Sequence, residues 1–305
     1  MPVSANHTPQ NNVAGPDALP ALDPQVALFL DFDGTLVDIA AQPEAVIVPP
    51  DLVATLQRLA ARLDGALAIV SGRTLRELDH FLSPLKLPTA AEHGAQQRLP
   101  NGETIRLAAP DLREATRLAS ELATSHAGLR VEIKPAAVAL HYRHAPELEA
   151  VCLQVMLDAS RTTPGVELLR GKFVFEIKPA GINKGTSIAD FMKQSGFIGR
   201  QPLFAGDDVT DETGFAAMPA LNGHGIKVGD GPSLAFYRCA SPTALRAWLA
   251  AASQAAEQPD VAENTAVDAP DALEDLSHAA DAARAEESAS TPTPATAPTS
   301  DPSRP

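Results

Sequence analysis

Residues 26–36 read VALFLDFDGTL, a continuous apolar run that leads into two aspartates separated by one residue. An apolar run without polar alternation is typical of a parallel strand that is covered on both faces. Side chains at positions i and i+2 of a strand point the same way, so Asp31 and Asp33 should project together. We therefore expect both carboxylates at the carboxyl end of a buried strand, where open α/β sheets bind their ligands.

The paired carboxylates of this stretch also predict a metal site. Two carboxylates this close repel each other unless a cation or a shared proton lies between them. Mg²⁺, a hard cation that takes oxygen ligands, fits that position. The alternative is a charged loop that merely ends a strand. The wholly apolar run before Asp31 and the Gly34-Thr35 pair after Asp33 favour the metal site.

Short apolar runs alternate with helical patterns on both sides of this motif. Strand–helix alternation predicts a doubly wound, Rossmann-like α/β fold with a parallel sheet. We expect strands at 26–32, 67–70, 89–92, 202–205 and 225–228. We expect helices at 51–63, 74–81, 185–194, 212–217 and 242–251.

Residues 102–180 follow a different pattern, in which a helix and a hairpin occur twice. The helices are expected at 110–125 and 146–160, and the hairpins pair 129–133 with 138–142 and 166–169 with 172–177. This α+β unit is inserted between the third and fourth strands of the sheet. We expect it to form a cap domain, or lid, over a catalytic core made of 25–101 and 181–251.

The ends of the 305-residue chain differ in composition from its middle. Residues 1–24 are rich in Pro, Asn, Ala and Asp and predict a flexible leader. Residues 252–305 hold 11 acids, 2 bases and no aromatic residue, so they cannot bury enough apolar surface to fold alone. We expect a disordered acidic tail, and a partner-binding segment is the alternative.

The overall composition argues against several classes of protein. Hydrophobic residues make up 45% and charged residues 20%, as in a globular protein, and the net charge of −14 disfavours nucleic-acid binding. No apolar run approaches the roughly 20 residues of a membrane span. No Lys or Arg precedes Arg58 and no apolar stretch precedes Val26, so we expect no signal peptide. Cys152 and Cys239 lack CxxC spacing, so we expect no disulfide, no zinc site and a cytoplasmic location.

A second acidic cluster reads GDDVTDE at 206–212 and follows the apolar run 203–205. Two acidic loops at one sheet edge can complete an oxygen cage around a metal ion. Some of these acids could instead cap a helix, because Thr210 or Asp211 is a good N-cap and acids favour the first turn.

Two further motifs suit a phosphate group. The SGR sequence at 71–73 opens a helix, where backbone N–H groups and the Ser71 hydroxyl suit an anion. The NKG sequence at 183–185 offers the Lys184 ammonium as a charge for phosphate. Taken singly, Ser71 could be only a helix cap and Lys184 only a surface lysine. Together with the acids, they describe a site that handles phosphate.

The order DFDGTL, VSGR, NKG, GDDVTDE resembles that of the haloacid-dehalogenase superfamily of phosphohydrolases. Within it, further stretches resemble the trehalose-6-phosphate phosphatase family. These stretches are AEHGA at 91–95, EIK at 132–134, HYR at 141–143, EIKP at 176–179 and IKVG at 226–229. The resemblance covers about 26–250, and the motifs of the cap are less specific than the four catalytic ones.

The resemblance implies a phosphoric monoester hydrolase that releases trehalose and phosphate from trehalose 6-phosphate in trehalose biosynthesis. It implies that Asp31 is the nucleophile of an aspartyl-phosphate intermediate, and that Asp33 protonates the leaving oxygen and then activates water. It also implies Mg²⁺, held by Asp31, the backbone carbonyl of Asp33, and Asp207, with Asp208 or Asp211 as outer support. The expected phosphate-binding residues are Ser71, Gly72 and Lys184.

Substrate choice is expected to come mainly from the cap. A disaccharide is a dense array of hydroxyls, and a site built to bond hydroxyls rejects analogues that lack them. The expected substrate-binding residues are Arg73, His93, Glu132, Lys134, His141, Arg143 and Glu176. The alternatives are exposed strand positions for the cap residues and a structural role for His93. Lys134 or Arg143 could instead contact the phosphate.

Three other functions remain open from the sequence. The first is a phosphatase of another sugar phosphate, such as sucrose phosphate or mannosyl-phosphoglycerate, and the second is a mutase. The third is a non-catalytic regulatory module that contacts a trehalose-6-phosphate synthase. The presence of Asp31, Asp33 and Lys184 argues against the third, because a binding module needs no nucleophile.

Overall fold

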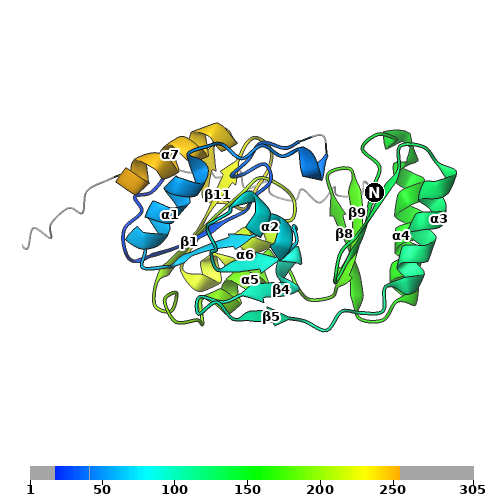
Figure 1. The fold of residues 1–305 in the computed structure, drawn as a ribbon, viewed down its shortest axis with the longest axis horizontal. Helices are drawn as coiled ribbons and strands as arrows, with labels where there is room; N and C mark the ends of the chain where they lie inside the picture. The colour runs from blue at the N-terminus through cyan, green and yellow to red at the C-terminus, as the bar shows by residue number, and fades with distance from the viewer. Residues whose placement is uncertain (1–17, 41, 255–305) are drawn as a thin grey trace, which may run out of the picture. The chain divides into compact units, whose positions relative to one another are not determined.

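The computed structural model describes residues 18–40 and 42–254, which contain two β-sheets (Figure 1). The larger sheet has eight strands in the order β12-β11-β10-β1-β2-β3-β4-β5. Its six parallel strands are β1 (Val26–Leu30), β2 (Leu67–Val70), β3 (Thr89–Ala91), β10 (Gln201–Gly206), β11 (His224–Val228) and β12 (Tyr237–Cys239). The predicted doubly wound α/β core is therefore confirmed.

The edge of this sheet departs from the expected all-parallel arrangement. Strands β4 (Gln96–Arg98) and β5 (Thr104–Arg106) are antiparallel and extend the sheet beyond β3. They read QQR and TIR, so neither has the apolar run from which the other strands were recognised. Because β5 pairs within the larger sheet, the polypeptide leaves that sheet after Arg106 and not at residue 102.

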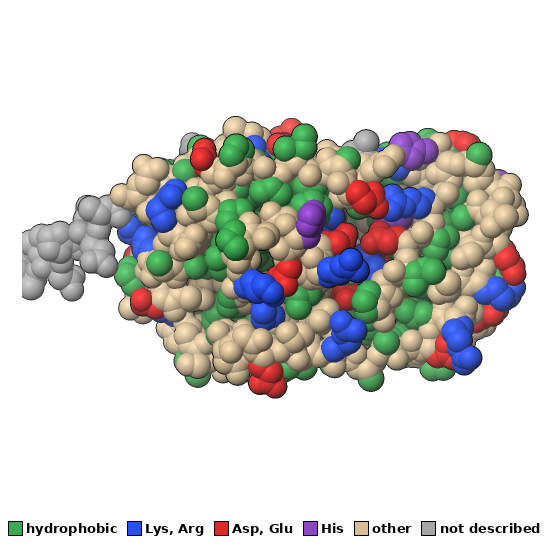
Figure 2. Space-filling view, in the orientation of Figure 1, with side chains coloured by type: hydrophobic (Ala, Val, Ile, Leu, Met, Phe, Trp, Pro, Cys, Tyr) green, Lys and Arg blue, Asp and Glu red, His purple; other side chains and the backbone are tan. Residues whose placement is uncertain are grey.

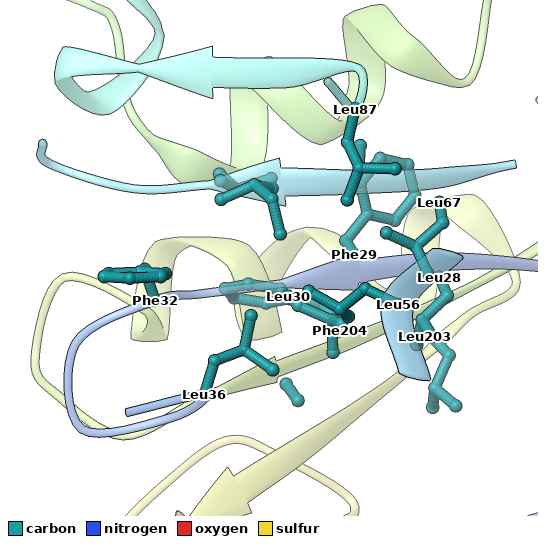
Figure 3. Packing of buried hydrophobic residues seen from close by; sticks show 14 of the residues in the cluster. Leu28, Phe29, Leu30, Phe32, Leu36, Leu56, Leu67, Leu87, Leu203 and Phe204 are labelled. Atoms are coloured by element: carbon teal, nitrogen blue, oxygen red, sulfur yellow. The ribbon is translucent and has the colours of Figure 1, made fainter. Parts of the chain in front are cut away.

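Helices cover both faces of the larger sheet. Alternate side chains of β1 point to opposite faces: Phe29 lies 6.2 Å from Phe191 of α5 (Lys184–Phe191), measured between ring centroids. Leu28 and Leu30 point the other way, toward Leu56 of α1 (Leu52–Arg62) (Figure 3). Three more helices complete the core: α2 (Leu75–Phe81), α6 (Glu212–Ala217) and α7 (Pro242–Gln254).

The smaller sheet is the predicted α+β insertion. It is antiparallel, with the order β6 (Arg130–Ile133), β7 (Val138–His141), β9 (Val174–Pro179), β8 (Val166–Gly171). Helices α3 (Arg113–Ser125) and α4 (Glu149–Thr162) cover one face (Figure 1) and share an apolar cluster with Phe175 and Ile177. The side chain of Glu176, between these two, therefore points to the uncovered face. We call this insertion, which contains β6–β9, α3 and α4, the cap.

Smaller expectations are refined by the structure. The turn between β8 and β9 lies at Lys172 and Phe173, two residues after the expected position, and Phe173 has φ +62°.

Cys152 and Cys239 are buried and free. No helix among residues 18–40 and 42–254 is long and apolar enough to cross a membrane.

Most of the predicted leader and tail, residues 1–17 and 255–305, lies outside the described residues. The last part of the leader is folded: Leu22 is buried in the core cluster, and the Trp248 indole N–H donates to the Pro20 carbonyl over 3.3 Å. This short segment, ALPALDP at 18–24, therefore packs on the core and bonds to helix α7, a contact that composition alone does not reveal.

Candidate active site

The carboxylates of the two acidic motifs meet at the carboxyl end of the larger sheet. Asp31 follows β1 and Asp207 follows β10, and these strands are direct parallel neighbours. Oxygens of Asp31, Asp207 and Asp211 lie within 4.8 Å of one another. The Thr35 hydroxyl lies 3.3 Å from Asp31 Oδ2 and 3.4 Å from Asp207 Oδ1, so it bridges the two loops.

Gly34 is required by this close approach. It has φ +76°, and a Cβ at this position would lie 2.2 Å from an oxygen of the Asp207 carboxylate. Any other residue would therefore displace Asp207 and would also strain the backbone.

The donor set of this cluster fits a hard divalent cation. Burial and the neighbouring charges of Asp208 and Asp211 raise the pKa of Asp207 to about 7, and burial also raises the pKa of Asp31 well above its usual value. A cation between such carboxylates relieves both their repulsion and their desolvation. Asp31 and Asp207 are placed to serve as ligands.

Asp208 and Asp211 hold the loop itself. Asp211 Oδ2 accepts the amides of Asp207 and Asp208, each over 2.9 Å, and Asp208 Oδ1 accepts the amide and hydroxyl of Thr210 over 2.7 and 2.6 Å. Asp211 Oδ1 accepts from Lys184 over 2.6 Å. The expectation that Thr210 or Asp211 caps the following helix is wrong: Asp211 stands at the N-cap position of α6, but its side chain bonds the loop amides before it and makes no cap bond.

Lys184 is a buried residue and not a surface lysine. It opens α5, which Asn183 and Thr186 cap reciprocally, and its ammonium donates to Asp31 Oδ1 over 2.7 Å. Burial alone would lower the pKa of Lys184, but the carboxylates of Asp211 and Asp31 raise it above its usual value. The ammonium therefore stays charged beside the carboxylate of Asp31.

Ser71 is not the cap of the following helix. Helix α2 is capped by Thr74, whose hydroxyl accepts the Glu77 amide while the Glu77 carboxylate accepts the Thr74 amide. Ser71 lies three residues earlier, is buried at the end of β2, and faces the cavity described below.

Arg73 is hydrogen-bonded to Asp33, a pair that could not be predicted from the sequence. Its guanidinium donates to both Asp33 oxygens over 2.6 and 2.8 Å and to the Pro43 carbonyl over 2.9 Å. It also packs against the rings of Phe32 and Phe81. Such a bidentate, stacked arginine fixes the orientation of its carboxylate. No part of the linear sequence signals this pair.

The charged residues expected in the cap converge on its uncovered face. Lys134 Nζ donates to Glu176 Oε2 over 2.7 Å, and His141 Nε2 lies 2.8 Å from Glu132 Oε2. Burial would raise the pKa of Glu132, but the hydrogen bond from His141 and the charge of Lys134 lower it to about 2. Glu176 Oε1 is buried without a hydrogen-bond partner among the described residues.

His93 and Arg143 complete the predicted set. His93 Nε2 is 3.7 Å from Glu176 Oε1. Burial, followed by the charges of Lys134 and Lys184, keeps the pKa of His93 well below its usual value, so the ring is neutral. The Arg143 guanidinium stacks on the Phe173 ring at 5.3 Å.

The predicted site residues line one cavity of about 350 Å³ between the larger sheet and the cap. In Figure 2, acidic and basic side chains and a histidine gather around its opening. It contains every predicted site residue: Asp31, Asp33, Ser71, Gly72, Arg73, His93, Glu132, Lys134, His141, Arg143, Glu176, Lys184 and Asp207.

Three features in and around this cavity could not be predicted from the sequence. The segment around Ile39 and Pro43 forms part of its wall, and Arg130 of the cap forms an ion pair with Glu44 beside it. Lys227 Nζ binds the Asp207 carbonyl over 2.5 Å and so supports the acidic loop from β11. Arg130 could have been suspected, because it shares a strand face with Glu132.

Comparisons with known proteins agree with this geometry. Residues 29–242 match the trehalose-phosphatase family. The chain is 40% identical over 241 residues to trehalose-6-phosphate phosphatase of Escherichia coli (strain K12), covering 78% of this chain and 91% of that protein. Among solved structures, it is similar to a trehalose-6-phosphate phosphatase related protein, with a TM-score of 0.61 and 29% identity over 75% of this chain and 96% of the other.

The fold is shared more widely. A haloacid dehalogenase-like hydrolase from B. subtilis superposes with a TM-score of 0.55 at 15% identity, over 73% of this chain and 98% of the other. At this identity the likeness concerns the fold alone.

Proposed function

The chain belongs to the trehalose-phosphatase family, and from this premise we propose that it hydrolyses trehalose 6-phosphate through an aspartyl-phosphate on Asp31. One observation carries the proposal. Asp31 lies beside the buried ammonium of Lys184 at the floor of a cavity whose cap side presents Glu132, Lys134 and Glu176. A phosphate group suits the floor, and a sugar suits the hydrogen-bonding groups of the cap.

The core residues divide the chemistry among themselves. An Asp31 oxygen attacks phosphorus, while Lys184 and Ser71 bind the phosphoryl oxygens and offset their charge. Asp33, oriented by Arg73, gives a proton to the leaving sugar oxygen and then takes one from the water that cleaves the acyl phosphate. Asp31, the Asp33 carbonyl and Asp207 would hold Mg²⁺, which when bound neutralises phosphoryl charge.

Three side chains of the cap are suited to bind the hydroxyl groups of a sugar. Lys134 is a donor, Glu132 stays ionised as an acceptor, and Glu176 Oε1 is a buried acceptor with no hydrogen-bond partner among the described residues. A buried acceptor without a partner is costly, and a sugar hydroxyl would satisfy it. The two free cysteines are consistent with a reducing compartment, which supports action in the cytoplasm within trehalose biosynthesis.

Phosphate release tests the proposed reaction and its metal together. Purified protein given trehalose 6-phosphate and Mg²⁺ is expected to release phosphate rapidly, and removal of metal with EDTA to slow release on the order of 10²-fold or more. Readdition of Mg²⁺ should restore the rate. Glucose 6-phosphate and sucrose 6-phosphate serve as controls. Faster release from either would keep the mechanism and discard the substrate, whereas no release from any of the three would discard both.

Replacing Asp33 by Asn is expected to slow hydrolysis of trehalose 6-phosphate about 10²–10⁴-fold, because an amide cannot protonate the leaving sugar oxygen. p-Nitrophenyl phosphate has a leaving group that departs without a proton. With this substrate the variant should release about one equivalent of p-nitrophenolate in a burst and then turn over slowly, because water activation also needs Asp33. Stopped-flow absorbance measures the burst. An unchanged rate with trehalose 6-phosphate would remove Asp33 from the mechanism.

A further inference from the structure

Two adjacent residues after β3 have an unusual backbone. Glu92 has φ +50° and His93 has φ +58°, and both side chains are buried. Residues other than glycine adopt this left-handed region at a cost, and two in succession persist only where the surroundings hold them firmly. We call this segment, Glu92–Gly94, the EHG turn.

The backbone of the EHG turn is bonded to the phosphate-binding loop at 71–73. The Glu92 amide donates to the Arg73 carbonyl over 2.8 Å, and the His93 amide donates to the Ser71 carbonyl over 3.0 Å. The carbonyl between them, that of Gly72, accepts from Lys134 of the cap over 3.1 Å. Three consecutive carbonyls of the loop are thus held, two by the EHG turn and the middle one by the cap.

The side chain of Glu92 reaches the same part of the cap. Its Oε2 accepts the amide of Ala136 over 3.0 Å. Ala136 lies in the turn between β6 and β7, which the Lys134 amide closes by donating to the Ala137 carbonyl over 2.8 Å. Glu92 therefore holds the turn from which Lys134 extends to Gly72 and Glu176.

Glu92 does not line the cavity, so it acts through other residues and not on the substrate. From these contacts we propose that Glu92 is a positioning residue that docks the cap turn on the core. The docking sets Lys134 against the Gly72 carbonyl and thereby couples the position of the cap to the phosphate-binding loop. The kinetic consequence rests on the proposed function, whereas the docking itself does not.

Amide hydrogen exchange tests the docking without any substrate. Glu92→Met keeps the volume of the side chain but removes the acceptor, and Glu92→Gln keeps an oxygen that can accept from Ala136. We expect the peptide containing the Ala136 amide to exchange about tenfold faster in Glu92→Met and near the wild-type rate in Glu92→Gln. Glu92→Ala also removes the acceptor but places no long side chain at this position. It should speed exchange as Glu92→Met does, and so controls for any effect of the Met side chain on packing. Unchanged exchange in these variants would overturn the proposal.

Kinetics on two substrates separate positioning from a structural role. With trehalose 6-phosphate, kcat/KM is expected to fall about tenfold in Glu92→Met and to recover in Glu92→Gln. With p-nitrophenyl phosphate, which has no sugar for the cap to bind, it should change less than about twofold. An equal loss on both substrates with a lowered melting temperature would show a structural role and overturn the proposal.

Glu103→Gln is the matched control, because Glu103 is an exposed glutamate near the turn between β4 and β5 of the same core. It should leave exchange at Ala136 and both kinetic constants unchanged. If wild-type protein failed to hydrolyse trehalose 6-phosphate, the proposed function would fall, while the exchange experiment would still decide the role of Glu92.

Discussion

Replacing Asp31 by Asn is expected to lower the turnover of trehalose 6-phosphate by on the order of 10⁴-fold or more, because an amide oxygen is a poor nucleophile toward phosphorus. The fold should survive. An asparagine oxygen can still accept from Lys184, and the substitution removes a buried carboxylate that lies near those of Asp207 and Asp211. Phosphate release and thermal melting, measured on the same preparation, check both statements.

The melting temperature of the metal-free Asp31→Asn protein should equal or exceed that of the wild type at pH 7. Burial raises the pKa of Asp31 in the folded protein. At any pH above the usual pKa of an aspartate, keeping Asp31 folded therefore costs free energy, and a neutral Asn avoids that cost. Asp38→Asn is the control for the same chemical change at an exposed position, where Asp38 pairs with Arg246, and it should have little effect. Activity within about tenfold of wild type in Asp31→Asn would contradict the assignment of the nucleophile.

Replacing Lys184 by Met is expected to reduce both activity and stability. The phosphoryl oxygens lose their buried cation, so turnover should fall on the order of 10³-fold. Asp31 and Asp211 are left buried without their partner, and breaking a buried ion pair in this way costs about 3–5 kcal/mol of unfolding free energy. Urea denaturation of the metal-free proteins measures the difference.

The stability loss in Lys184→Met should shrink as the pH falls. Without the ammonium, the pKa values of both aspartates rise further, and protonation below them removes the unpaired charges. Lys193→Met, which changes an exposed lysine shortly after the same helix, is the control and should alter stability by less than about 0.5 kcal/mol. Equal stability of Lys184→Met and wild type at neutral pH would mean that the ion pairs contribute nothing.

The sequence predicts those parts of the fold that depend on local patterns. Apolar runs place β1, β2 and β10 correctly, and parallel neighbours then bring Asp31 and Asp207 together. Strands β4 and β5 were not found, because their residues are polar and their pairing depends on the turn between them. Thr74, and not Ser71, caps α2, since either residue type suits an N-cap and only the folded backbone distinguishes them.

The candidate site shows the same limit at the level of single contacts. Residue types and spacing bring every predicted residue to one cavity. The partners of those residues could not be predicted: Arg73 binds Asp33 across 40 residues of sequence, and Glu92 binds Ala136 across 44. The first pair depends on how the loops after β1 and β2 meet, and the second on how the cap meets the core. No local pattern encodes either arrangement.

The contacts between core and cap differ in how salt affects them. The ion pair between Glu44 and Arg130 is exposed, so mobile ions screen it over a Debye length of about 8 Å at physiological ionic strength. The contact of the Lys134 ammonium with the Gly72 carbonyl is more deeply buried and largely shielded from those ions. Raising the salt concentration therefore weakens the exposed contact between Glu44 and Arg130, while the buried contact between Lys134 and Gly72 persists.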